Sequence, residues 1–141
     1  MKKSYMNDSR LCQIIGGEPT VYPEIIKIIT AAKKIGFPVI QIVTNGLNLS
    51  NYSFFKKLRD AGLNSVTFSI HSYKPEKHDM IVGIKGAFKN VIKSIENAIR
   101  LNVHIAVGTA INAINYRDIE NLVKFLHEQY GIETFHLIGL H

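Results

Sequence analysis

Apolar residues recur along this chain with two alternating periods. Four stretches repeat them every three or four residues, which predicts four amphipathic helices. Shorter runs rich in Ile, Val and Phe predict strands at 12–16, 39–44, 65–71, 103–110 and 134–139. The helical stripes are Ile25, Ile28, Ile29 and Ala32; Phe54, Phe55 and Leu58; Phe88, Val91, Ile92, Ile95 and Ile99; and Ile119, Leu122, Val123 and Leu126.

Turn and cap residues mark the ends of these helices. At the helix starts, Pro23 suits a first helical turn and Ser50 suits an N-cap. At the helix ends, a left-handed C-cap is expected at Gly36, Gly62, Asn102 and Gly131.

Strand and helix alternate strictly, which implies parallel strands joined by right-handed crossovers. The pattern therefore predicts an α/β protein, either an open doubly wound sheet or a piece of a β/α barrel. In both architectures, ligands bind at the carboxyl ends of the strands. No linker or low-complexity tract divides residues 1–141, which predicts a single domain.

The third predicted strand, 65–71, alternates polar with apolar residues. A period of two turns Val66, Phe68 and Ile70 toward the helices and the polar set toward the opposite face. Inside a small barrel, such a face indicates a wet or ligand-filled lumen, because unpaired buried polar groups are costly. The polar set consists of Ser65, Thr67, Ser69 and His71.

Polar or glycine residues stand at four successive strand ends, as "GGEPT", "TNG", "SIHS" and "INAIN". Each alone has a plain structural interpretation. "GGEP" and Asn45-Gly46 can be turns, and His71 can be a surface histidine. Their occurrence at consecutive strand ends favours a functional site.

Composition narrows the possible functions. Apolar residues make up 46% of the 141 positions and charged residues 20%, as in a folded soluble protein. Seventeen basic against eleven acidic residues give a net charge of +6, but the lysines lie mainly on helix faces, so nucleic-acid binding is not expected. No membrane span or signal-peptide core is evident, which predicts a cytoplasmic location. A lone Cys12, expected in the core, excludes an internal disulfide and a cysteine-built metal site.

The ordered strand ends resemble a radical S-adenosylmethionine (SAM) domain, and the resemblance runs from about Leu11 to Leu140. It includes "HDMIVGIKGAFKNVIKSI", which is similar to the loop and helix after the third of these strands. That family has a laterally open (β/α)6 partial barrel, with an iron–sulfur cluster and SAM at the carboxyl ends of the strands. The resemblance thus implies a partial (β/α) barrel of about five parallel strands alternating with four helices.

The resemblance also implies roles for individual residues. Gly16, Gly17 and Glu18 would hold the SAM ammonium through backbone carbonyls and a carboxylate, with Pro19 in the same cofactor-binding loop. Ser69 would contact the ribose. The other implied positions are Asn45 and His71, which line the site, and Gly108 and Ala110, which leave room for the adenosyl group.

The family's CxxxCxxC motif is missing from this sequence. Its thiolates hold a [4Fe–4S] cluster, which binds SAM and donates the electron that cleaves it to an adenosyl radical. Cys12 alone cannot hold such a cluster, and it lies directly before the GGE turn. The family's first strand and cluster loop also have no counterpart before Cys12. We therefore interpret the chain as a radical SAM domain that is incomplete at its N-terminus.

The resulting hypothesis is SAM binding and reductive SAM cleavage for hydrogen-atom abstraction, once the domain is complete. It implies a small-molecule substrate and an electron-donor protein, and it leaves room for a complementing chain that carries the cluster motif. The alternative is a non-catalytic SAM- or nucleotide-binding α/β module. A sugar- or phosphate-metabolising barrel is disfavoured, because Glu18 in the first loop would repel a phosphate.

Overall fold

Five parallel strands form one sheet in the order β1-β2-β3-β4-β5. The computed structural model describes residues 8–139, so the end of the family resemblance at Leu140 lies outside the described residues. The strands are β1 (Leu11–Ile14), β2 (Val39–Thr44), β3 (Ser65–Ser69), β4 (His104–Ile111) and β5 (Thr134–Gly139). The α-helices are α2 (Ile25–Ile35), α3 (Tyr52–Ala61), α4 (Pro75–Val82), α5 (Ala87–Arg100) and α6 (Ile119–Tyr130), and the 3-10 turns are η1 (Pro19–Val21), η2 (Asn48–Ser50) and η3 (Tyr116–Asp118).

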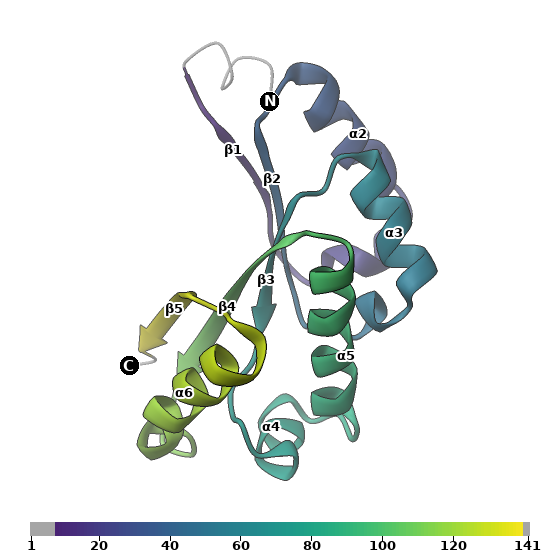
Figure 1. Ribbon diagram of the computed structural model, residues 1–141. Coiled ribbons are helices and arrows are strands. Elements are labelled where there is room, and N and C mark those ends of the chain that lie inside the picture. The colour runs from purple at the N-terminus through teal and green to yellow at the C-terminus, as the bar shows by residue number, and fades with distance from the viewer. Residues whose placement is uncertain (1–7, 140–141) are drawn as a thin grey trace.

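The helices α2, α3 and α5 lie along one side of the twisted sheet, as Figure 1 shows. The core fills the space between the sheet and these helices, where Val66, Phe68 and Ile70 are fully buried. The apolar half of the third strand therefore faces the helices, as its alternation predicted. The five-stranded half-barrel agrees with the predicted fold class.

One helix was not predicted as a separate element, so the structure has five α-helices rather than four within residues 8–139. Helix α4 begins at Pro75, and His78 is its only buried residue. An eight-residue helix that buries one histidine has no apolar stripe, and hydrophobic periodicity cannot detect it.

Two predictions about helix starts were wrong. Asn51, and not Ser50, caps α3: its Oδ1 accepts a hydrogen bond from the Phe54 amide at 3.0 Å. The Ser50 hydroxyl donates instead to the Leu47 carbonyl at 2.7 Å, because the chain forms η2 before the helix. Pro23 precedes α2 by two residues and lies outside it.

The predicted strand bounds also need small corrections. Strand β1 ends at Ile14 rather than at residue 16, because Gly16 and Gly17 take positive φ angles of 100° and 46° that leave the pleat. Strand β3 ends at Ser69 rather than at residue 71. The predicted left-handed C-caps are confirmed at Gly36 and Gly131. Gly62 caps α3 with a φ of 132°, outside the left-handed helical region, and Asn102, with a φ of 54°, follows the α5 C-cap residue Leu101.

Buried polar side chains of α5 hold the loop that follows β2. Ser94 donates its hydroxyl hydrogen to the Gly46 carbonyl, and Asn97 Nδ2 donates to the carbonyls of Leu49 and Ser50 at 2.9 and 3.1 Å. These bonds satisfy backbone groups that would otherwise be buried without partners. They hold the loop after β2 against α5.

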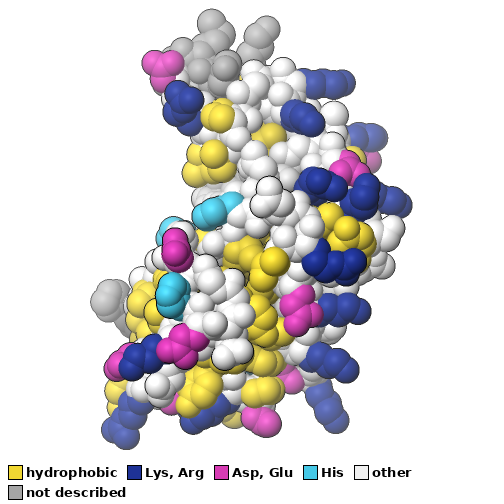
Figure 2. All heavy atoms as spheres, viewed as in Figure 1, with side chains coloured by type: hydrophobic (Ala, Val, Ile, Leu, Met, Phe, Trp, Pro, Cys, Tyr) yellow, Lys and Arg dark blue, Asp and Glu magenta, His cyan; other side chains and the backbone are white. Residues whose placement is uncertain are grey.

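Basic side chains are spread over the helical side of the molecule in Figure 2 rather than gathered into one patch. That distribution gives no support to a nucleic-acid interface, for which a basic stripe is expected. Within residues 8–139, none of the helices has the length and apolar character needed to cross a membrane.

Candidate functional site

The loop after β1 lies at the carboxyl edge of the sheet. Its two glycines, Gly16 and Gly17, are exposed, and a Cβ atom added to either would meet nothing within 4 Å. Their positive φ angles, rather than crowding, account for glycine at these positions. The backbone of this loop is therefore exposed, and its contact with a ligand stays a prediction.

Glu18 ties this loop to the end of β2. Its Oε1 accepts hydrogen bonds from the amide and hydroxyl of Thr20, at 3.1 and 2.5 Å, and from the Thr44 hydroxyl at 2.6 Å. Its Oε2 accepts from the Asn45 amide at 2.8 Å. Since Oε2 has one donor and two lone pairs, it can still accept from a ligand ammonium. Contact between Glu18 and SAM stays a prediction. The structure shows that Glu18 anchors the loop after β1 to the end of β2.

Two further predicted residues shape the same loops. Pro19 is buried at the first position of η1, which Glu18 caps. The Asn45 Oδ1 accepts from the Leu47 amide at 3.0 Å, so the side chain closes a local turn. Both residues are placed at the carboxyl edge, where they support the loop backbone.

A cavity of about 340 Å³ lies on the helix-free face, at the carboxyl ends of β3 and β4. It brings together the predicted residues Ser69, His71, Gly108 and Ala110. The cavity is also lined by His136 of β5, to which the sequence analysis gave no role. His136 and Ile138 are two positions apart, so the period of two along β5 could have identified this face. The full lining is Gln13, Val43, Thr67, Ser69, His71, Gly108, Thr109, Ala110, His136 and Ile138.

Thr67 in this cavity has a buried hydroxyl without a partner. The residue is 4% exposed, and its Oγ1 makes no hydrogen bond within residues 8–139. The neighbouring Thr109 differs, because its hydroxyl donates to the Ile70 carbonyl at 2.6 Å. Unsatisfied buried polar groups are rare in native proteins and call for an explanation.

His71 stands at the rim of the same cavity, in a network that joins β3 to β4. Its Nδ1 accepts from the Ala110 amide at 3.2 Å, and its backbone amide donates to His78 Nδ1 at 3.2 Å. The two imidazole rings are stacked with centroids 5.9 Å apart. Burial lowers the pKa of His71, and burial reinforced by the nearby His71 lowers the pKa of His78 to about 4. Both rings are therefore neutral at physiological pH.

A row of hydrogen-bonded polar side chains crosses the same face of the sheet in the amino-terminal half of the strands. Gln13 donates to Gln41 at 2.6 Å, Gln41 donates to Ser65 at 2.9 Å, and the Ser65 hydroxyl lies 3.3 Å from His104 Nδ1. These four residues are direct neighbours in the strand register. Gln41, Ser65 and His104 line a second cavity of about 590 Å³ at the amino ends of the strands, whereas Gln13 lines the cavity at the carboxyl ends, and His136 lines both. Both cavities therefore contain side chains that can form hydrogen bonds, set among apolar ones.

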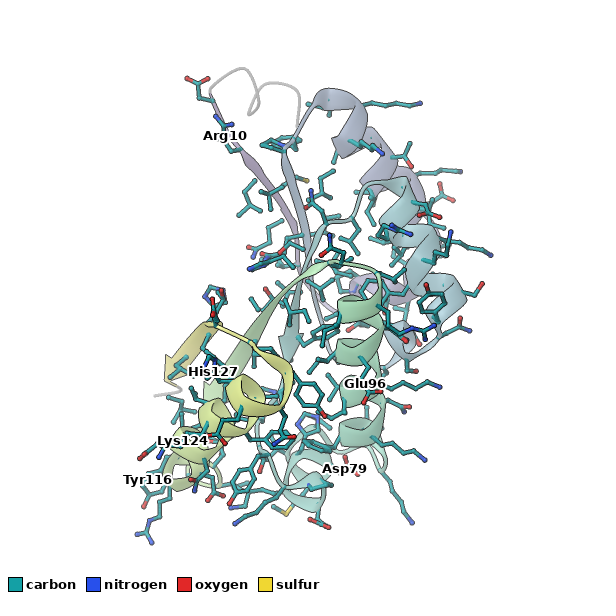
Figure 3. The ribbon with its side chains drawn as sticks, in the orientation of Figure 1. Arg10, Asp79, Glu96, Tyr116, Lys124 and His127 are labelled. Carbon is teal, nitrogen blue, oxygen red and sulfur yellow. The ribbon has the colours of Figure 1, made fainter. Side chains whose placement is uncertain are left out.

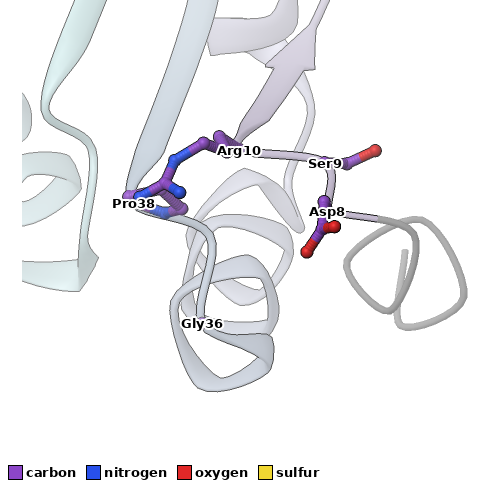
Figure 4. Close-up of a pocket in the computed structure, with 5 residues that line it drawn as sticks. All are labelled: Asp8, Ser9, Arg10, Gly36 and Pro38. Atoms are coloured by element: carbon purple, nitrogen blue, oxygen red, sulfur yellow. The ribbon is translucent and has the colours of Figure 1, made fainter.

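A third hollow, of about 240 Å³, lies at the opposite, amino edge of the sheet. Figure 4 shows that the Asp8 carboxylate and the Arg10 guanidinium there point away from each other. They do not converge on a common ligand position. This hollow is also remote from the strand ends on which the predicted site is built.

The residues present do not fit an iron–sulfur cluster. Cys12 packs partly buried against the core, and burial raises the pKa of its thiol, which disfavours the thiolate that iron requires. Within residues 8–139, no group of three or more His, Cys, Asp and Glu side chains could hold a metal ion. Cys12 is also the only cysteine of the sequence. A cluster would need ligands from outside this chain.

Sequence comparisons connect this geometry to known proteins. The radical SAM superfamily matches residues 2–126. A probable GTP 3',8-cyclase of Saccharolobus islandicus is 33% identical over 137 residues, which are 95% of this chain and 42% of that protein. Another from Sulfurisphaera tokodaii is 31% identical over 133 residues, which are 94% of this chain and 41% of that protein. The chain thus spans less than half the length of these curated relatives.

Solved structures share the fold. Native anSMEcpe with bound AdoMet superposes with a TM-score of 0.72 at 18% identity, over 99% of this chain and 40% of that one. A domain of pyruvate-formate lyase-activating enzyme from Bacteroides vulgatus gives a TM-score of 0.73 at 14% identity, over 92% of this chain and 80% of that one. With its half-barrel of parallel strands and a family match over most of its length, this chain belongs to the radical SAM superfamily.

Proposed function

We propose that this chain is the SAM-binding part of a radical SAM enzyme. The observation that carries the proposal is the carboxyl edge of the sheet. There, an exposed glycine loop follows β1, a cavity lies at the ends of β3 and β4, and Glu18 is bonded to the end of β2 between them. The family uses SAM together with a [4Fe–4S] cluster.

Different residues of this edge would bind different groups of SAM. Backbone carbonyls at Gly16 and Gly17, with the remaining lone pair of Glu18 Oε2, would accept hydrogen bonds from the ammonium group. Ser69 would bond the ribose, and Gly108 would admit the nucleoside because it has no side chain. One-electron reduction of bound SAM would break its S–C5′ bond, release methionine and leave an adenosyl radical for abstraction of a hydrogen atom from a substrate.

The cluster ligands would come from outside these 141 residues. The lone Cys12 supports this view, since it is partly buried and has no further cysteine beside it. The supplying segment would belong to the same protein or to a complementing chain, and an electron-donor protein would reduce the cluster. The same observation favours a second candidate function, a SAM- or nucleotide-binding module without catalysis.

A purine nucleotide is the first substrate to test in the completed enzyme. The relatives from Saccharolobus islandicus and Sulfurisphaera tokodaii are named as probable GTP 3',8-cyclases.

SAM binding to the 141-residue chain, measured by isothermal titration calorimetry, tests the proposal. Wild type should bind, and Glu18→Gln should bind about tenfold more weakly, because one amide oxygen cannot hold the loop as a carboxylate does. Glu24→Gln is the matched control, since Glu24 makes only an exposed ion pair with Lys27. Absence of binding by wild type would overturn the proposed function.

A second measurement separates the two candidate functions. With a reductant and iron and sulfide supplied, the chain alone should form no 5′-deoxyadenosine. Addition of a polypeptide carrying CxxxCxxC should restore its formation if the domain is the core of an enzyme. SAM binding that never leads to cleavage, even with that polypeptide, would favour the non-catalytic module.

A further inference from the structure

We propose that Asn115, in the turn after β4, is a positioning residue: its side-chain amide sets the distance between the ends of β3 and β4 where the cavity of about 340 Å³ opens. The proposal rests on the proposed function, because it concerns the shape of the edge that receives SAM. It depends on three observations: the two strands stop pairing through their backbones near the cavity, a fully buried Asn115 joins them there, and the turn that carries Asn115 is itself fixed.

Strands β3 and β4 change from backbone to side-chain pairing at the cavity. The bond from the Ile70 amide to the Gly108 carbonyl, at 3.0 Å, continues the ladder just past β3. A regular parallel ladder would continue with a bond from the Ala110 amide to the Ile70 carbonyl. Instead, the Thr109 hydroxyl donates to that carbonyl at 2.6 Å, and the Ala110 amide donates to His71 Nδ1 at 3.2 Å. The two backbones therefore part here, and side chains bridge them.

Asn115 makes the bridge that involves both backbones. Its Nδ2 uses both hydrogens, donating to the His71 carbonyl at 3.0 Å and to the Ala110 carbonyl at 2.9 Å. Its Oδ1 accepts from the Asn112 amide at 2.8 Å. The residue is 0% exposed, so water does not compete for these bonds. One planar amide group therefore fixes the separation of the two strand ends.

The turn that carries Asn115 is fixed from two sides. Within the turn, Asn112 Oδ1 accepts from the amides of Ile114 and Asn115 at 2.8 and 3.2 Å. From outside it, Lys77 of α4 donates to the Ile114 carbonyl at 3.4 Å and pairs with Asp118. The bridging amide is thus held in place before any ligand arrives, which lowers the cost of ordering the site on binding.

The two residues that Asn115 joins, His71 and Ala110, both line the cavity, whereas Asn115 is not among its lining residues. Asn115 therefore acts on a ligand only through them. Loss of the bridge would free the two strand ends to move, so that a ligand would have to order them as it binds, at a cost in affinity. A purely structural asparagine would change the stability of the chain and leave this affinity as it is.

NMR of the side-chain amides in the 141-residue chain tests the bridge without any ligand. The two Nδ2 hydrogens of Asn115 should exchange with water about a hundredfold more slowly than those of Asn90, which is exposed on α5. Exchange at Asn115 as fast as at Asn90 would show that the amide is not held between the strand ends, and would overturn the proposal.

Calorimetric titration with SAM tests the positioning role. Asn115→Ala should bind SAM about fivefold more weakly than wild type, once the folded fraction from urea denaturation is taken into account. Asn115→Leu keeps the approximate size without any donor, so it should bind no better than Asn115→Ala. Asn64→Ala is the matched control. Asn64 also makes two side-chain bonds to backbone groups, those of Pro38 and Ile40 at 2.8 and 2.9 Å, but at the amino edge of the sheet. It should lose stability and keep the wild-type affinity.

The outcomes separate this proposal from the proposed function. Wild-type affinity in a folded but destabilised Asn115→Ala would overturn the positioning role and leave SAM binding intact. Should neither Asn115 variant fold, wild type alone decides: saturation with SAM should slow exchange at the Asn115 amide further, because binding and closure of the bridge are linked. Exchange that SAM leaves unchanged would overturn the role. Failure of wild type to bind SAM would overturn the proposed function and the positioning role together.

Discussion

At the scale of single residues, some glycines are required by the backbone conformation alone and others also by close packing, although their sequence contexts look alike. Gly16, Gly17 and Gly83 have positive φ angles and open space around the missing side chain. Gly46 also has a positive φ, but a Cβ there would lie 2.7 Å from Val91 Cγ2 and 3.1 Å from a Phe68 ring carbon. The turn after β2 therefore needs glycine for packing as well as for conformation.

Gly46→Ala should destabilise the fold by about 3 kcal/mol, from backbone strain and overpacking together. Gly83→Ala is the matched control, because its φ of 73° is close to the 78° of Gly46 and nothing lies within 4 Å. It should cost about 1 kcal/mol, from strain alone. Urea denaturation of both variants checks the difference. Equal losses of unfolding free energy in the two variants would show that the close approach of Gly46 to Val91 of α5 does not matter for stability.

At the scale of elements, the start of α5 depends on a residue of the preceding helix. Its N-cap, Gly86, has no side chain, and Asp79 of α4 takes its place by accepting from the amides of Gly86 and Phe88 at 2.6 and 2.8 Å. Figure 3 shows Asp79 beside the start of α5. The Phe88 bond, followed by the Gly86 bond, lowers the pKa of the Asp79 carboxyl group. A positive helix end and a carboxylate thus stabilise each other.

Asp79→Ala should destabilise the chain by about 1 kcal/mol, the usual effect of a lost N-cap. Hydrogen exchange should quicken at the Gly86 and Phe88 amides more than in α2. Asp60→Ala serves as the control, since Asp60 only pairs with exposed Lys56 and Arg59. Unchanged exchange at Phe88 would contradict the capping role.

At the scale of the whole molecule, the buried histidine pair makes stability depend on pH. His78 is 1% exposed, and its pKa is lowered from 6.5 to about 4. Between these values the unfolded chain binds a proton that the folded chain does not, so stability falls as the pH falls. His71, whose pKa burial also lowers, acts in the same direction.

Lowering the pH from about 7 to about 4 should therefore reduce the free energy of unfolding by about 3 kcal/mol through His78. Urea midpoints at closely spaced pH values would measure the loss. His78→Phe should flatten the curve in this window, while His127→Gln, on exposed helix surface, should not. A wild-type curve that is level across the window from 6.5 down to about 4 would show that His78 titrates normally.

Local patterns in the sequence were sufficient for the parallel α/β class, while the choice of a partial barrel over an open doubly wound sheet came from the family resemblance. Alternation in Val66, Phe68 and Ile70 predicted the buried face of β3, and positive-φ caps such as Gly36 and Gly131 predicted the helix ends. Such features depend on residues a few positions apart, so periodicity records them. They also placed Ser69 and His71 on the same face as Gly108, as the cavity confirms.

The roles of the polar atoms were decided only by the tertiary structure. The bonds from Thr44 and Asn45 to Glu18, and the bond from the Ala110 amide to His71, join residues that lie far apart in the sequence. Helix α4 likewise forms around one buried histidine, without an apolar stripe of its own. A hydrogen bond requires atoms to approach within about 3 Å, and a sequence pattern determines faces and periods but not such distances.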